Sequence, residues 1–269
     1  MVSQARAALG HLLMRLPRRL TDLSQVRVIG PWLHHISQAL LSPESRIWVR
    51  IRSGPGEGLW MSVNPRTGGR LYCGSHEPAV QRALLTYLRP GMVFYDLGAN
   101  TGLFTLIGAR CVGMEGKVHA FEPDPEVCQR LRDNVLRNSY SNVVVVQSAI
   151  GSRKGLADFV RVDPSVSPDR GLGRLGTASN GAETIRVRSI SLDEYVKRAP
   201  PPDVLKCDVE GAERDVLDGA RSLVERTRPI IVCETHSEGG AVEVEGWFVA
   251  ANYRTRWIDD THLLALPRT

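Results

Sequence analysis

The strongest local pattern is a glycine loop that follows an acid, Asp96-Leu-Gly98-Ala-Asn100-Thr-Gly102, between a predicted strand and a predicted helix. Glycines at such a turn let the backbone approach a ligand closely. A loop that binds the pyrophosphate of a dinucleotide has a second glycine where this chain has Asn100. A pyrophosphate-binding loop also lacks a nearby carboxylate. The loop of this chain follows Asp96, which favours a cationic ligand such as S-adenosylmethionine. The alternative is an ordinary strand–turn–helix connection.

A second acid follows the next predicted strand. Glu122, in Phe121-Glu-Pro-Asp-Pro125, stands 24 residues after Gly98. An acid at the tip of the second strand in such folds accepts hydrogen bonds from the ribose hydroxyls. We interpret Asp124 as a helix cap rather than a ligand. Ser148 comes after the third strand, where the edge of an adenine would lie, so we include it among the predicted cofactor-binding residues.

Two further groups of charged residues end later strands. Lys206, Asp208 and Glu210 alternate along the chain, which predicts that they share one face of a strand. Glu234 and His236 alternate in the same way after residues 230–233. The tips of parallel strands meet at one edge of a sheet, so we expect these side chains to converge. His236, or otherwise Asp208 or Glu210, is the predicted catalytic base, and His236 is expected to have a base strength suited to neutral pH.

Other interpretations of the same residues stay open. Lys206 with a neighbouring carboxylate is typical of a structural ion pair at a strand end, and Glu213 can serve only the dipole of its helix. A divalent metal on the oxygens of Asp208, Glu210 and Glu234 is an alternative to a side-chain base. We predict no metal site.

The elements that must position these residues alternate from residue 92 onward. Predicted strands cover residues 92–97, 117–121, 143–146, 204–209 and 230–233, and predicted helices lie between them. This order predicts an open parallel sheet with helices on both faces. Residues 253–257 and 262–266 form a predicted hairpin at one edge. Residues 151–192 break the rhythm, and residues 163–182 within them are interpreted as a mobile loop, either a lid over the substrate or a plain surface loop.

Taken together, these motifs resemble the FkbM family of S-adenosylmethionine-dependent methyltransferases. The resemblance rests on residues 90–102, Phe121-Glu-Pro123, residues 205–220 with the stretch Lys206-Cys-Asp-Val-Glu-Gly211, and Arg228-Pro229. It implies a Rossmann-like seven-stranded sheet and, for many members, O-methylation of sugar or polyketide hydroxyls. It implies that the cofactor contacts Asp96, Gly98, Asn100, Gly102 and Glu122. The pair Glu77-Pro78 also fits the family, and Glu77 joins the predicted cofactor-binding residues.

The charge distribution separates the N-terminal segment from the rest. The net charge of +5 equals the balance of the first fifty residues alone, which hold seven arginines and two acids. A nucleic-acid-binding domain would carry positive charge throughout, so we expect no nucleic-acid partner. We predict two domains: a basic helical segment with short strands at residues 1–72 and a methyltransferase domain at residues 73–269. The leucines within residues 1–45 favour a helical cap on the domain, with a dimer contact or a membrane-surface contact as alternatives.

The expected partner is a small-molecule or glycan acceptor. Five widely spaced cysteines without a CxxC pair indicate reduced thiols and a cytoplasmic protein. Two other classes remain open, a binding protein on a degenerate methyltransferase fold and a nucleic-acid methyltransferase. The intact acids and glycines of the loop disfavour the first, and the neutral main domain disfavours the second.

Overall fold

The structure, a computed structural model, describes residues 45–163, 173–176 and 182–268. The chain divides into two compact units, one up to His76 and one formed mainly by Glu77–Val162 and Gly171–Thr269. In the first unit, β1 (Ile47–Arg50) pairs antiparallel with β2 (Trp60–Val63), which confirms that short strands are present there. A five-residue helix follows, α4 (Gly69–Cys73), in addition to the predicted short strands. The predicted helices of residues 1–44 lie outside the described residues.

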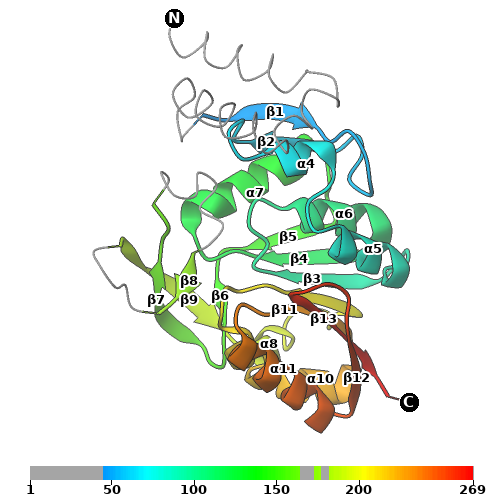
Figure 1. Ribbon diagram of the computed structural model, residues 1–269, viewed down its shortest axis with the longest axis vertical. Coiled ribbons are helices and arrows are strands. Elements are labelled where there is room, and N and C mark those ends of the chain that lie inside the picture. Colours follow the sequence, from blue (N-terminus) through cyan, green and yellow to red (C-terminus); the bar gives the residue numbers. More distant parts are fainter. Residues whose placement is uncertain (1–44, 164–172, 177–181, 269) are drawn as a thin grey trace, which may run out of the picture. The chain divides into compact units, whose positions relative to one another are not determined.

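The second unit is built on a seven-stranded sheet in the order β12-β13-β11-β10-β3-β4-β5 (Figure 1). Its strands are β3 (Val93–Leu97), β4 (Lys117–Phe121), β5 (Val143–Val146), β10 (Val204–Cys207), β11 (Ile230–Glu234), β12 (Tyr253–Trp257) and β13 (His262–Pro267). All neighbours pair in parallel except β11 with β13 and β12 with β13, which form the predicted antiparallel edge. This confirms the predicted Rossmann-like α/β sheet.

Alternation along β3 explains why the sheet carries helices on both faces. Phe94 and Asp96 point to the face covered by α5 (Pro78–Tyr87), α6 (Leu103–Val112) and α7 (Pro125–Arg137), where Thr105 of α6 donates a hydrogen bond to Asp96. Tyr95 and Leu97 point to the other face and join one apolar core with α9 (Glu213–Asp218), α10 (Arg221–Thr227) and α11 (Glu238–Ala250). Figure 1 shows these two helix layers. Both layers bury apolar area, the main favourable contribution to folding.

The order of the strands reverses between β3 and β10. From β3 the chain proceeds to β4 and β5 on one side, and it later returns to place β10 and β11 on the other. In open α/β sheets, ligands bind at the carboxyl ends of the strands beside such a reversal. The glycine loop follows β3 and the Asp208–Glu210 segment follows β10, so both lie at this position.

Residues 149–190 form a second, smaller sheet that interrupts the alternation. It consists of β6 (Ala149–Ile150), β7 (Gly155–Val160), β8 (Arg174–Leu175) and β9 (Thr184–Ile190), followed by a single turn, α8 (Leu192–Tyr195). The interpretation of residues 163–182 as one loop is wrong at β8, which pairs with β7. Residues 164–172 and 177–181 of that stretch lie outside the described residues.

Two predicted elements differ from the structure in length. The helix predicted between residues 209 and 230 is split into α9 and α10, because the chain turns at Gly219 and Ala220. A Cβ on Gly219 would lie 2.2 Å from the backbone oxygen of Gly151, so this close approach requires glycine. The strand predicted to run to residue 209 ends at Cys207. In the described part of the chain the longest helices, α7 and α11, have 13 residues each, too few to cross a bilayer, which takes about 20.

Candidate functional site

The loop after β3 is shaped by three residues with positive φ, Gly98 (72°), Asn100 (48°) and Gly102 (97°). The backbone N–H groups of Gly98 and Ala99 both donate to the carbonyl of Phe121, which ties the loop to the end of β4. Gly98 also touches the segment after β10, because a Cβ there would lie 1.7 Å from the backbone oxygen of Asp208. A glycine is therefore required at position 98 for its conformation and for the close approach.

Glu122 lies directly beside this loop. Its carboxylate accepts hydrogen bonds from the backbone N–H of Asn100 (3.0 Å) and of Asp124 (2.9 Å). Burial raises its pKa to about 8, an effect that these two hydrogen bonds partly oppose. Asp124 caps α7 by accepting from the N–H groups of Glu126 and Val127, which confirms its interpretation as a cap. Glu122, one of the predicted cofactor-binding acids, thus contacts the backbone of the glycine loop.

Asp96 and Lys206 form a buried ion network beneath the loop. They are register partners on β3 and β10, and both are buried. Lys206 Nζ lies 2.9 Å from Asp208 Oδ2, 3.8 Å from Asp96 Oδ1 and 5.0 Å from the ring centre of Phe104. Thr105 donates to Asp96 Oδ2, while Oδ1 is buried and accepts no hydrogen bond from the described residues. Burial raises the pKa of Asp96, and Lys206 opposes that shift.

His236 stands at the centre of four carboxylates. Its Nδ1 lies 2.9 Å from Glu213 Oε1, and its Nε2 lies 3.2 Å from Glu210, 3.6 Å from Asp208 and 4.0 Å from Glu234. The structure therefore brings together the three residues predicted as catalytic. Asp208 and Glu210 lie on the segment after β10, and His236 lies just beyond β11. Three of the side chains are about one fifth to one quarter exposed, so the cluster is open to a ligand.

Glu210 reaches this cluster by a turn and not by strand alternation. β10 ends at Cys207, and Glu210 (φ 56°) and Gly211 (φ 97°) adopt left-handed conformations. The turn is held by Glu213, whose carboxylate accepts the N–H of Gly211 at 2.9 Å. The prediction that Lys206, Asp208 and Glu210 share a strand face is therefore wrong for Glu210. Its convergence with His236 depends on a glycine turn that two-residue periodicity does not describe.

The electrostatics of the cluster alter the roles expected of its members. The hydrogen bond with Glu213 raises the pKa of His236 to about 9, and Glu210 and Asp208 add to that shift. Burial raises the pKa of Glu210 to about 7, with contributions from Asp208, Glu234 and Glu213 against the opposing imidazolium. An imidazole with a pKa near 9 is already protonated at neutral pH. The expectation that His236 has a base strength suited to neutral pH is therefore wrong, and Glu210 has that property.

Two predicted cofactor residues make other contacts. The hydroxyl of Ser148 lies 2.9 Å from the carbonyl of Ala149 and 3.1 Å from that of Arg188, so it supports the junction of β6 with β9. Glu77 precedes α5 and lies 3.5 Å from His262 Nε2. Its charge also raises the pKa of Asp96, which places Glu77 at the same sheet edge as the loop.

Sequence reasoning missed two residues at this edge. Glu213 was considered only for its helix dipole, although it orients His236 and holds the Gly211 turn. His262 begins β13 and is the register partner of Glu234 at the end of β11. The signal for His262 was the predicted hairpin itself, because the start of an antiparallel strand meets the end of its neighbour.

The residues present fit S-adenosylmethionine. Asp96 retains a buried carboxylate oxygen without a hydrogen bond in the described part of the chain, and Glu122 retains acceptor capacity beyond its two backbone partners. These two acids suit an ammonium group and ribose hydroxyls. How each of these residues contacts the cofactor stays a prediction.

Comparisons with known proteins agree with this chemistry. The family model "Methyltransferase FkbM domain" matches residues 96–255. The hexuronic acid methyltransferase AglP of Haloferax volcanii is 32% identical over 163 residues, which are 60% of this chain and 63% of AglP, so the match spans less than two thirds of that protein. The 31-O-demethyl-FK506 methyltransferase FkbM of Streptomyces tacrolimicus is 29% identical over 182 residues, 58% of this chain and 69% of that protein. The crystal structure of methyltransferase FkbM from Methylobacillus flagellatus KT is 18% identical with a TM-score of 0.48, over 73% of this chain and 54% of that one.

Proposed function

The chain belongs to the FkbM family of methyltransferases, and on that premise we propose that it methylates a hydroxyl oxygen of a sugar, glycolipid or polyketide-type molecule. The predicted family and the predicted cofactor, S-adenosyl-L-methionine, are confirmed. When bound, this cofactor supplies a methyl carbon activated by a sulfonium, and the carbon–sulfur bond breaks as the new carbon–oxygen bond forms. The acceptor hydroxyl must also lose its proton, and that step is left to the protein.

One observation carries the proposal. Gly98 of the cofactor loop touches the backbone of Asp208, and the side chain of Asp208 belongs to the carboxylate cluster around His236. The segment that holds the cofactor and the segment that can accept a proton are therefore packed directly against each other. A methyltransferase that acts on an alcohol needs this combination, because the acceptor oxygen must meet a proton acceptor and the methyl group together.

Within this cluster we assign to Glu210 the role of general base, which removes the proton of the acceptor hydroxyl. Because its pKa is about 7, Glu210 is ionised in about half of the protein molecules at neutral pH, which suits a general base. His236, protonated and 3.2 Å away, stabilises that carboxylate. Asp208 is held by Lys206, and Glu213 fixes the imidazole through Nδ1. His236 and Glu213 then act as positioning residues.

Glu122, Asp96 and the loop of Gly98, Asn100 and Gly102 would hold the cofactor. The named relatives support a small-molecule acceptor, since one acts on a hexuronic acid and the other on 31-O-demethyl-FK506. A cytoplasmic location, a homodimer and a membrane-surface contact through residues 1–45 are further proposals. The predicted division at residues 72 and 73 also stays a prediction.

Calorimetric titration of the chain with S-adenosyl-L-methionine, and with NAD as the control ligand, tests the first part of this proposal. Binding of S-adenosyl-L-methionine alone is expected. Absence of binding would favour the degenerate, non-catalytic alternative.

The second part needs a hydroxyl acceptor and two glutamate variants. Glu210→Gln should abolish methyl transfer while cofactor affinity is kept. Glu225→Gln, on an exposed position of α10, should leave both unchanged. Full turnover by Glu210→Gln would remove Glu210 as the base, and methylation of RNA or DNA in preference to small hydroxyl acceptors would replace the acceptor class.

A further inference from the structure

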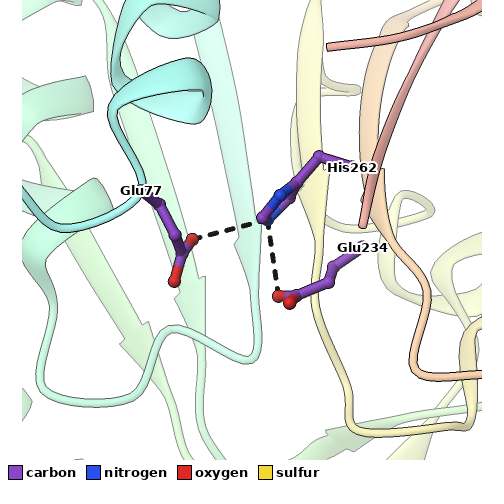
Figure 2. Close-up of side chains that lie close together, drawn as sticks. All are labelled: Glu77, Glu234 and His262. Carbon is purple, nitrogen blue, oxygen red and sulfur yellow. Dashed lines mark ion pairs between the residues drawn. The ribbon is translucent and has the colours of Figure 1, made fainter. Parts of the chain in front are cut away.

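A second group of ligating side chains lies beside the His236 cluster. Figure 2 shows Glu77, Glu234 and His262 pointing toward one another from three different segments. Glu77 precedes α5, Glu234 ends β11 and His262 begins β13. His262 Nε2 lies 3.5 Å from Glu77 Oε2 and 3.4 Å from Glu234 Oε2. The three ligand atoms all lie within 4.8 Å of one another.

These two contacts are ion pairs that are longer than an ideal charge-assisted hydrogen bond, and their lengths also suit ligands of one metal ion. A hydrogen bond between an imidazolium and a carboxylate has an N···O distance of about 2.7–2.9 Å. Two ligands that are each about 2.1 Å from a tetrahedral zinc ion lie about 3.4 Å apart, since the bond angle is about 109°. The two measured separations of 3.4 and 3.5 Å match the second distance.

The imidazole is oriented as metal-binding histidines usually are. His262 is 2% exposed, and its Nδ1 lies 2.8 and 3.0 Å from the two carboxylate oxygens of Asp259. The backbone N–H of His262 also donates to Asp259, which fixes the acid against the ring. A carboxylate on Nδ1 holds the proton there and leaves the lone pair on Nε2 for a metal. Nε2 is buried and faces the carboxylates of Glu77 and Glu234 at 3.5 and 3.4 Å.

We propose that Glu77, Glu234 and His262 bind one divalent transition-metal ion, with zinc the best fit to their spacing. Burial lowers the pKa of His262, but Glu234 and Glu77 raise it to about 10, so a metal ion must displace the Nε2 proton. Two carboxylates and the neutral imidazole that results carry a charge of −2, which a divalent cation balances. Mixed nitrogen and oxygen ligands suit zinc better than calcium or magnesium, which prefer oxygen alone. Three protein ligands leave a fourth position open, as in zinc sites that also bind a substrate or water.

This site differs from the metal alternative raised by the sequence. That alternative used Asp208, Glu210 and Glu234, and only Glu234 is common to both. The two oxygens of Glu234 face different partners, because Oε1 lies 4.0 Å from His236 and Oε2 lies 3.4 Å from His262. A metal at the proposed site would therefore fix Glu234 at the border of the His236 cluster. It would also fix the segment before α5 against the β11–β13 edge.

Metal binding is tested without any activity measurement, so its outcome is separate from that of the proposed function. The full chain, purified without a histidine tag and freed of metal with a chelator, is titrated with Zn²⁺ by calorimetry and with Co²⁺ by visible absorption. We expect one equivalent to bind and the Co²⁺ spectrum to show nitrogen and oxygen ligation. Absence of stoichiometric binding would overturn the proposal, as would a thiolate charge-transfer band, since that assigns the metal to cysteine.

Two variants locate the site. Glu77→Gln keeps the shape of a partly exposed side chain and should weaken Zn²⁺ binding at least about tenfold, the lower range for disturbing a metal site. His236→Gln, in the neighbouring cluster, should retain the affinity of the unmodified chain. The opposite pattern would place the metal among Asp208, Glu234 and His236 and refute the proposed ligands. Circular dichroism of both variants checks that each is folded. If Glu77→Gln does not fold, His262→Gln provides a second ligand variant.

Discussion

Replacing Gly98 with alanine tests the idea that the cofactor loop and the Asp208 segment depend on one close contact. An alanine Cβ at this position would lie 1.7 Å from the Asp208 carbonyl oxygen, whereas ordinary contact begins at about 3.4 Å. The Asp208 backbone or the loop must therefore move by about 1.7 Å. Such a shift disturbs the hydrogen bond from the N–H of Asp208 to Leu97 and the ion pair of Asp208 with Lys206.

The magnitude can be separated into a conformational and a steric part. A left-handed alanine costs about 1–2 kcal/mol relative to glycine. Gly91 (φ 87°) has no neighbour within 4 Å of its Cβ position, so Gly91→Ala measures that cost alone. It should lower the melting temperature by about 2–8 °C for a domain of this size. Gly98→Ala also displaces Asp208 from its ion pair with the buried Lys206, so it should cost more than Gly91→Ala, with about 3–5 kcal/mol, the cost of removing a partner from a buried pair, as the upper limit.

The assay is thermal unfolding of both variants, followed by calorimetric titration with S-adenosyl-L-methionine and by steady-state kinetics with a hydroxyl acceptor. We expect Gly98→Ala to melt well below Gly91→Ala and to lose about 100-fold in kcat/KM, since a displacement of about 1 Å at a reacting site has that effect. Gly91→Ala should bind the cofactor normally. Equal melting temperatures and equal cofactor affinities in the two variants would refute the contact between loop and Asp208 as the link between the two halves of the site.

Three other expectations follow from the charged groups of the site. Glu210 can accept a proton only in its ionised form, so kcat/KM should fall about tenfold per pH unit below a pKa of about 7 and level off above it. A pH profile that is flat from pH 5 to 8 contradicts this. Hydrogen bonds from ribose hydroxyls favour the ionised form of Glu122. Cofactor affinity should therefore rise with pH up to about 8 and then become constant. Calorimetry in buffers of different ionisation enthalpy should show the proton that is released on binding. Glu122→Gln should remove that pH dependence, and its persistence in the variant would assign the proton elsewhere. Lys206→Met leaves Asp96 buried without its cation and should cost about 3–5 kcal/mol of unfolding free energy. Because burial raises the pKa of Asp96, this loss should shrink as the pH is lowered, and urea unfolding at pH 5 and pH 8 measures the trend.

The order and nature of the main elements could be predicted from the sequence because they depend on local patterns. Residues 117–121 read as a buried strand and form β4 with those bounds, and Asp124-Pro125 reads as a helix start and begins α7. Gly98 and Gly102 mark a left-handed turn in the sequence and have positive φ in the structure. Hydrophobic periodicity, helix caps and glycine turns each act within a few residues, so the chain itself displays them.

The roles of the charged residues depended on contacts between distant segments. The sequence placed an acid and a histidine at neighbouring strand tips, but it contained no measure of the 2.9 Å contact with Glu213 that raises the pKa of His236. Glu210 joins His236 through a left-handed turn, and His262 joins Glu234 through pairing of β11 with β13. Charge interactions and burial change steeply over a few ångströms. The sequence by itself therefore determined the family, the fold and the glycine loop, whereas the contacts on which the proposed proton acceptor and the proposed metal site rest exist only in the tertiary structure.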